Sequence, residues 1–189
     1  MKNIVLFASG NGSNAENIVN YFAEREDVAF PLLLCNKRDA YVFERAKRLK
    51  VPARHIGRTE FQSEELVREL QQIPADLIVL AGFLWQIPPA MIEAFPHRIL
   101  NIHPALLPKF GGKGMYGERV HEAVIAAGEK ESGITIHAID ADYDRGTVVF
   151  QAKCPVMPEE TPETLAQKVH KLEYAHFPAV IDNYLEHLG

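Results

Sequence analysis

The sequence predicts an α/β fold in which helices flank a doubly wound, mostly parallel sheet. Continuous apolar runs such as KNIVLFAS (2–9) and DLIVLA (76–81) are typical of parallel strands that are buried on both faces. Amphipathic segments alternate with these runs, which favours right-handed crossover connections. A chain of 189 residues suits one such unit, so we expect residues 1–189 to form a single domain.

The first half of the chain supplies this alternation in order. After the first strand and a Gly/Asn loop, the pattern predicts a helix over about 15–25, a strand over 28–35, a helix over 40–49 and a short strand over 53–56.

A third helix and two further strands follow. Thr59 and Gln62 resemble a capping box, which predicts a helix with Leu66, Val67 and Leu70 on one face. The strand over 76–81, a helix starting at Pro88-Pro89 and a strand over 98–102 come next.

The second half of the chain changes character. Strands are expected over 134–139 and 147–156, joined by the acidic turn 140–146, as an antiparallel extension of the sheet. A helical stretch over 163–187 follows, and Pro178 within it predicts a kink or a break.

Composition excludes several classes of protein. The chain has 47% hydrophobic residues and no apolar run long enough to span a bilayer, so we expect no membrane association. Lys2 leads directly into a strand without a targeting segment, which indicates a cytoplasmic protein. A net charge of -5 argues against nucleic-acid binding. Cys35 and Cys154 are far apart and lack metal-ligand spacing, so we expect reduced, buried thiols.

The loop Gly10-Asn11-Gly12-Ser13-Asn14 joins the first strand to the first helix and is a candidate phosphate site. In a doubly wound fold this turn presents backbone N–H groups and a helix N-terminus to an anion. A simple turn with Ser13 or Asn14 as the helix cap is the alternative. The loop lacks the full GxGxxG spacing and the GK[ST] of a P-loop, which argues against NAD and ATP and favours a monophosphate.

Asn101 and His103 end a predicted parallel strand and emerge together at its carboxyl edge. An amide donor and an imidazole suit attack of an amine on an acyl carbon: Asn101 can stabilise the oxyanion, and His103 can move the proton. A carboxylate from the downstream turn can orient His103; spacing alone allows Asp140, Asp142 or Asp144. A packing pair at the strand end, or a solvated acidic turn, is the alternative.

Neither the acidic turn nor the other histidines predict a metal centre. The turn lacks EF-hand spacing, and His121 and His137 have no ligand spacing to His103. We therefore expect no metal ion.

Four segments together carry a resemblance that covers essentially the whole chain. They are Ser9-Gly10-Asn11-Gly12-Ser13-Asn14, Leu80-Ala81-Gly82-Phe83, Asn101-Ile102-His103-Pro104-Ala105-Leu106-Leu107-Pro108-Lys109, and Thr135-Ile136-His137 through Asp144-Arg145-Gly146. With these segments the chain closely resembles the phosphoribosylglycinamide formyltransferase family. The NIHPxLLP segment is shared by the wider formyltransferase superfamily, and the GNGSN loop is characteristic of this branch.

The resemblance implies a Rossmann-type formyltransferase fold and a transferase of purine (IMP) biosynthesis. Its two small-molecule substrates would be 10-formyltetrahydrofolate and glycinamide ribonucleotide, N1-(5-phospho-D-ribosyl)glycinamide, and the protein would be a monomer or homodimer. The implied catalytic residues are Asn101, His103 and Asp144. The implied ribonucleotide site comprises Gly12, Ser13, Asn14, His170 and Glu173. The implied folate site comprises Leu84, Trp85, Gln86, Ile87, Asn101, Asp140, Ala141, Asp142, Tyr143 and Asp144.

The chain departs from the best-known bacterial pattern in the folate segment. Trp85-Gln86 stands where those enzymes have an arginine, and another arginine is absent around Ser63, so we expect a reshaped pterin pocket. The glycine-rich segment 110–117 is longer than in that pattern. It is either a mobile flap, from which Lys113 can reach an anion, or an ordinary loop.

Three alternative functions remain at this stage. Methionyl-tRNA formyltransferase shares NIHPxLLP but adds a nucleic-acid-binding domain. Formyltetrahydrofolate hydrolase shares the Asn, His and Asp set but typically carries a regulatory domain. A non-catalytic sugar-phosphate sensor would need the first loop only.

Overall fold

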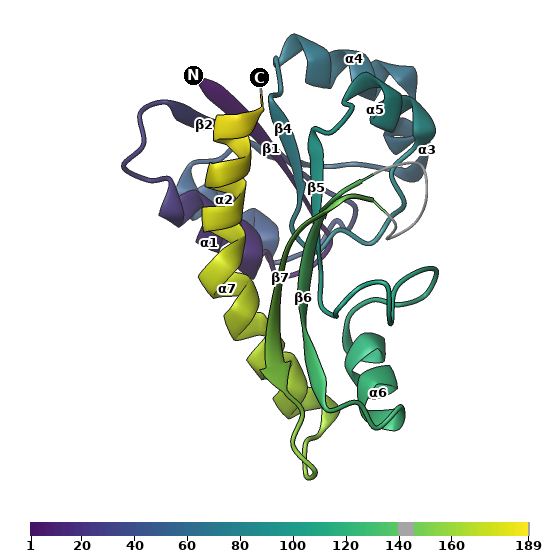
Figure 1. Cartoon of the computed structure of the whole chain (residues 1–189). Coiled ribbons are helices and arrows are strands. Elements are labelled where there is room, and N and C mark those ends of the chain that lie inside the picture. Colours follow the sequence, from purple (N-terminus) through teal and green to yellow (C-terminus); the bar gives the residue numbers. More distant parts are fainter. Residues whose placement is uncertain (140–145, 189) are drawn as a thin grey trace.

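A twisted sheet with strand order β3-β2-β1-β4-β5-β6-β7 forms the centre of the protein (Figure 1). The computed structural model describes residues 1–139 and 146–188. The strands are β1 (Lys2–Ala8), β2 (Val28–Cys35), β3 (Ala53–His55), β4 (Leu77–Leu80), β5 (Ile99–His103), β6 (Glu131–Ala138) and β7 (Val148–Pro155). β1 to β5 are parallel, and β6 and β7 extend the sheet antiparallel. The predicted fold class is confirmed.

Helices cover both faces of the sheet (Figure 1). They are α1 (Ser13–Tyr21), α2 (Val42–Leu49), α3 (Arg58–Phe61), α4 (Glu64–Gln72), α5 (Pro89–Ala94), α6 (Glu118–Ala126) and α7 (Pro162–His187). Buried side chains of α1, α2, α6 and α7 share one core cluster with the sheet, and those of α3, α4 and α5 share the other.

The alternation of side chains along β1 explains the two cores. Ile4 and Leu6 point into the α1/α2/α7 core, whereas Val5 and Phe7 point into the α3/α4/α5 core, and all four are fully buried. A strand that is buried on both faces must be apolar at every position, which is why the run reads as continuous rather than alternating.

The capping box predicted at Thr59 and Gln62 does not form. Thr59 lies inside the short helix α3, and a separate helix α4 starts one turn later with Ser63 as its N-cap. The Ser63 hydroxyl accepts a hydrogen bond from the Leu66 backbone N–H at 3.3 Å. The Ser63 hydroxyl thus pairs with a backbone N–H of the first turn of α4, which has no partner within the helix. Helix α4 therefore begins directly after Ser63.

Helix α6 was not predicted from the sequence. It starts after Gly117 and buries Val120, His121 and Val124 on one face. This i, i+1, i+4 pattern is a helical signal, but its short length and the preceding glycine-rich segment weaken it.

Of the kink or break predicted at Pro178, the break does not occur, because α7 runs without interruption from Pro162 to His187. A proline inside a helix leaves the carbonyl four residues earlier without its N–H donor, at a cost of about 3 kcal/mol. That carbonyl belongs to Tyr174, and the side-chain amide of Asn17 in α1 donates to it at 3.0 Å. A neighbouring helix therefore supplies the hydrogen bond that Pro178 removes.

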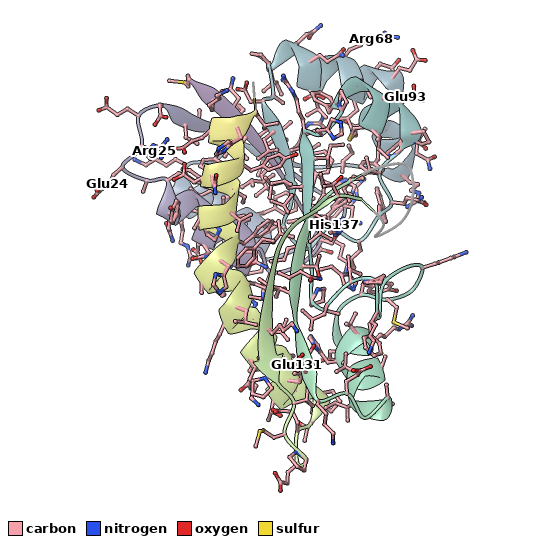
Figure 2. The ribbon with its side chains drawn as sticks, viewed as in Figure 1. Glu24, Arg25, Arg68, Glu93, Glu131 and His137 are labelled. Atoms are coloured by element: carbon pink, nitrogen blue, oxygen red, sulfur yellow. The ribbon has the colours of Figure 1, made fainter. Side chains whose placement is uncertain are left out.

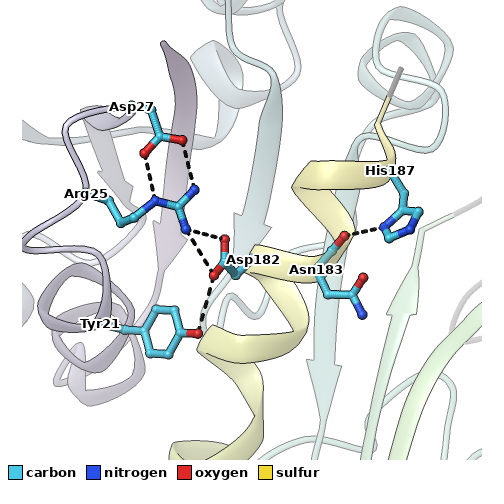
Figure 3. A network of polar contacts seen from close by, with 6 residues as sticks. All are labelled: Tyr21, Arg25, Asp27, Asp182, Asn183 and His187. Carbon is cyan, nitrogen blue, oxygen red and sulfur yellow. Dashed lines mark hydrogen bonds and ion pairs between the residues drawn. The ribbon is translucent and has the colours of Figure 1, made fainter.

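A second polar contact ties the chain after α1 to the end of α7 (Figure 3). The Arg25 guanidinium lies between two carboxylates, 2.7 Å from Asp27 Oδ1 and 2.9 Å from Asp182 Oδ1. Hydrogen bonds from Arg25 lower the pKa of Asp27 to about 2. Tyr21 donates its hydroxyl hydrogen to Asp182 at 3.4 Å. These contacts fix α7 against α1 on one face of the sheet.

Charged side chains lie on the outside of the sheet and helices. Figure 2 shows Glu24, Arg68 and Glu93 pointing away from the ribbon, whereas His137 belongs to strand β6 and is fully buried. In the described part of the chain, no helix is both long and apolar enough to cross a membrane.

Both cysteines are free thiols. Cys35 is fully buried, as predicted, while Cys154 on β7 is only partly buried. Burial raises the pKa of both thiols, which favours the protonated, unreactive form.

The Asn17 contact leads to a stability prediction. Asn17→Ala leaves the Tyr174 carbonyl without a protein donor, and we expect a loss of about 1 kcal/mol in the free energy of unfolding. In a Pro178→Ala background residue 178 regains its N–H, so the same Asn17→Ala change is expected to cost clearly less. Urea unfolding of the four proteins in a double-mutant cycle measures the difference. An equal cost in both backgrounds would show that Asn17 does not compensate for the proline.

Candidate active site

A cavity of about 920 Å³ opens at the carboxyl ends of the parallel strands. The strand order reverses at β1, which pairs with β2 on one side and β4 on the other. Loops leaving β1 and β4 therefore diverge and leave a crevice, the usual ligand site of an open α/β sheet. The cavity is lined by residues at or just after the carboxyl ends of β1, β4 and β5, including Ser9, Gly82 and His103.

The predicted phosphate loop forms one end of this cavity. Gly10, Asn11 and Asn14 line it, whereas Gly12 and Ser13 are not among the lining residues. Gly12 is the N-cap of α1 and has a φ of 77°, a left-handed conformation that favours glycine. The Ser13 N–H is held by the Asn11 side chain at 2.8 Å. The loop thus brings the N-terminus of α1 to the cavity, as predicted, with Gly12 shaping the turn.

Arg45 of α2 holds the outer side of this loop. Its Nε donates to the Asn11 carbonyl oxygen at 2.8 Å, and its guanidinium forms an ion pair with Glu16. Arg48 contacts the same Glu16 carboxylate at 2.7 Å. The Asn11 carbonyl is thereby turned away from an anion that would approach the N-terminus of α1.

Asn14, His170 and Glu173 meet beside the loop, although 159 residues separate Asn14 from Glu173. The Asn14 amide donates to Glu173 Oε2 at 2.9 Å, and His170 Nδ1 lies 3.0 Å from the same oxygen. Asn14 Oδ1 is buried and has no hydrogen-bond partner within the described part of the chain. All three residues line the cavity, so the group predicted for one substrate is assembled in one place.

Asn101 and His103 line the middle of the cavity from the end of β5. His103 is 4% exposed, and its Nε2 lies 2.7 Å from the Phe110 carbonyl oxygen. A carbonyl only accepts hydrogen bonds, so Nε2 carries a proton. The Asn101 Nδ2 lies 3.1 Å from Nε2 of His137, which receives one of its two hydrogens. The second amide hydrogen remains for a ligand.

The chain after His103 is fixed by Thr135, which is fully buried in β6. The Thr135 hydroxyl donates to the Ala105 carbonyl at 2.7 Å and accepts from the Leu107 N–H at 3.0 Å. Gln151 of β7 donates to both the Thr135 hydroxyl and the Leu107 carbonyl. The antiparallel extension therefore holds the segment that follows the imidazole.

The far end of the cavity is apolar. Leu84, Trp85, Gln86 and Ile87 line it. The Ser9 hydroxyl accepts from the Leu84 N–H at 2.9 Å, which ties this loop to β1. The Trp85 ring packs 5.3 Å from Phe61, and the Arg58 guanidinium lies 4.9 Å above it. An aromatic wall of this kind suits a flat, largely apolar ring system.

Some predicted residues lie outside the described residues, and some lining residues were not predicted. Asp140, Ala141, Asp142, Tyr143 and Asp144 fall in the undescribed segment. Lys37, two residues after β2, also lines the cavity and was not predicted, although residues that follow a parallel strand commonly face a ligand. His121 on α6 was likewise not assigned.

The cavity therefore combines three chemical environments in series. One end offers a helix N-terminus with polar side chains, the middle offers an amide and an imidazole, and the far end offers an aromatic wall. Such a site can hold a phosphorylated nucleophile and a flat donor molecule with their reacting atoms beside the amide and the imidazole.

Comparisons with known proteins agree with this arrangement. The chain matches the formyl transferase family over residues 2–181. It is 35% identical to the phosphoribosylglycinamide formyltransferase of Bacillus subtilis (strain 168), over 98% of this chain and 95% of that protein. It is 39% identical to the chloroplastic phosphoribosylglycinamide formyltransferase of Arabidopsis thaliana, over 95% of this chain. The chain spans 64% of the length of that plant relative.

Solved structures are similar over almost the whole chain. The glycinamide ribonucleotide transformylase 1 of Symbiobacterium toebii has a TM-score of 0.89 at 33% identity, covering 98% of this chain and 88% of that one. The phosphoribosylglycinamide formyltransferase of Streptococcus pneumoniae TIGR4 has a TM-score of 0.85 at 36% identity, covering 97% of this chain and 98% of that one.

Gly12 provides a test of the loop geometry. A Cβ at Gly12 would lie 2.2 Å from Val42 Cγ2 at a φ of 77°, so we expect Gly12→Ala to lower the free energy of unfolding by about 2 kcal/mol or more. Gly10→Ala is the matched control, because a Cβ there has no atom within 4 Å, and we expect a change within about 0.5 kcal/mol. Urea unfolding measures both; comparable losses would refute the close approach of Gly12 to α2.

Proposed function

The chain belongs to the formyl transferase family, and from this premise we propose that it transfers a formyl group from 10-formyltetrahydrofolate to the amine of glycinamide ribonucleotide. The observation that carries the proposal is the single cavity that joins the Asn14–Glu173–His170 contact to Asn101 and His103. A phosphate-binding end and a carbonyl-activating centre are what this two-substrate reaction requires.

The transfer is balanced without a covalent enzyme intermediate. The substrate amine forms a C–N bond to the formyl carbon, and the bond from that carbon to N10 of the folate breaks. One proton leaves the attacking nitrogen and one reaches N10. The residues in the middle of the cavity can therefore act by hydrogen bonding and proton transfer alone.

We assign these tasks to Asn101, His103 and Asp144. The free amide hydrogen of Asn101 would stabilise the oxygen of the tetrahedral intermediate. Nε2–H of His103, which donates to the Phe110 carbonyl in this structure, would be redirected to the reacting atoms. Asp144 would orient the ring of His103, the role that the family resemblance gives it.

The two ends of the cavity would bind the two substrates. Gly12, Ser13 and Asn14 would place the N-terminus of α1 at the ribonucleotide phosphate, while His170 and Glu173 would contact the rest of that substrate. Leu84, Trp85, Gln86 and Ile87, together with residues 140–144, would hold the folate ring system. In this proposal residues 1–189 act as one domain.

Mixing purified protein with 10-formyltetrahydrofolate, with and without glycinamide ribonucleotide, tests the proposal. We expect tetrahydrofolate to appear, followed by its absorbance, only when the ribonucleotide is present. Formation without the ribonucleotide would show a hydrolase, and no formation in either mixture would overturn the proposal. A sugar-phosphate sensor would bind the ribonucleotide in calorimetry without forming tetrahydrofolate.

His103→Asn tests the assignment of the proton-transfer group. Loss of a general acid or base lowers kcat by roughly 10²- to 10⁴-fold, and we expect the KM for both substrates to stay within a few fold. His97→Asn is the matched control, because His97 is exposed and lies outside the lining of the cavity. A kcat close to that of the unchanged protein would exclude His103 from proton transfer.

A further inference from the structure

His121 is a buried histidine of the cavity wall that the chemistry above does not use. It lies on α6, is 5% exposed and lines the cavity. Its Nδ1 is buried and has no hydrogen-bond partner among the residues that the structure describes. Buried polar groups are nearly always paired, so an unpaired imidazole in a ligand cavity needs an explanation.

The neighbours of the His121 ring in the cavity indicate which substrate it can contact. Helix α6 packs against α7, which carries His170 and Glu173. The charges of both Glu173 and His103 act on the His121 ring. His121 therefore shares the cavity with Glu173, at the end assigned to the ribonucleotide, and with His103, the imidazole assigned to proton transfer, and its helix packs against the helix that carries Glu173.

The ionisation of the ring fits a neutral hydrogen-bonding role. Burial lowers the pKa of His121, and the charge of His103 lowers it further, whereas Glu173 opposes both effects. A ring whose pKa lies below its usual value of about 6.5 is neutral near pH 7. A neutral imidazole has one N–H donor and one acceptor, so it can pair with hydroxyl, amide or amine groups but adds no net charge.

We propose that His121 is a binding residue for the ribonucleotide, and that its imidazole hydrogen-bonds the polar region of that substrate between the phosphate and the reacting amine. This inference rests on the proposed function. It gives α6 a direct role in substrate selection, because ribose hydroxyls and the glycinamide group are the hydrogen-bonding parts of such a molecule. The unpaired nitrogen is then a group whose partner arrives with the substrate.

His121→Phe is the central test, because it keeps a similar ring volume and removes both nitrogens. We expect the KM for glycinamide ribonucleotide to rise about tenfold or more, and the KM for 10-formyltetrahydrofolate to stay within twofold. We also expect the melting temperature without ligand to be equal or higher, since the change removes an unpaired buried polar group. If His121 had only a structural role, His121→Phe would lower the melting temperature. The two KM values would then either both change or both stay the same.

Two conservative variants identify the nitrogen involved. The amide of Asn ends about where Nδ1 of His lies, and the amide of Gln ends about where Nε2 lies. We expect one of His121→Asn and His121→Gln to retain more ribonucleotide affinity than His121→Phe. Glu122→Gln, on the exposed side of the same helix, is the matched control and is expected to change neither KM.

Calorimetric titration with glycinamide ribonucleotide separates failure of this inference from failure of the proposed function. If the unchanged protein transfers the formyl group and His121→Phe binds the ribonucleotide equally well, only the inference on His121 is overturned. If the unchanged protein binds the ribonucleotide without transfer, the proposed reaction fails, and the Phe variant still tests His121 through its affinity. If the unchanged protein does not bind the ribonucleotide, both are overturned.

Discussion

The pairing of β1 with parallel strands on both sides is the constraint on which the site depends. Because β2 and β4 pair with opposite edges of β1, the loops after β1 and β4 run to opposite sides. They leave a crevice between them at the carboxyl edge of the sheet. The carboxyl end of β5 lies at the same edge, so Asn101 and His103 line the same cavity as residues of the turn after β1. The strand order thus determines where the cavity lies, and the helices contribute side chains to its walls.

Predictability from the sequence follows the strength of the local signal. The buried strands were predictable because a run that is apolar at every position has few other solutions, and Asn101 and His103 followed from their place at a strand end. The separation of α3 from α4 was not predictable, because Thr59 and Ser63 are both plausible caps. The continuity of α7 past Pro178 depends on Asn17, 161 residues away, and no local pattern contains such a contact.

Residues that support the site were harder to predict than residues that line it. Arg45 acts on the Asn11 carbonyl, and Thr135 on the segment after His103, yet neither belongs to a motif of ligand-binding residues. Each one pairs backbone groups that would otherwise be free beside the cavity. In the proposed reaction, groups held in a fixed orientation would favour catalysis because they need not reorganise during the reaction.

The hydrogen bond from Asn17 to the Tyr174 carbonyl also couples the backbone of α7 to the wall of the cavity. Tyr174 directly follows Glu173, so the backbone repaired by Asn17 is the turn of α7 that presents Glu173 and His170 to the cavity. Loss of the Asn17 donor would therefore act on the wall of the cavity as well as on the stability of the helix.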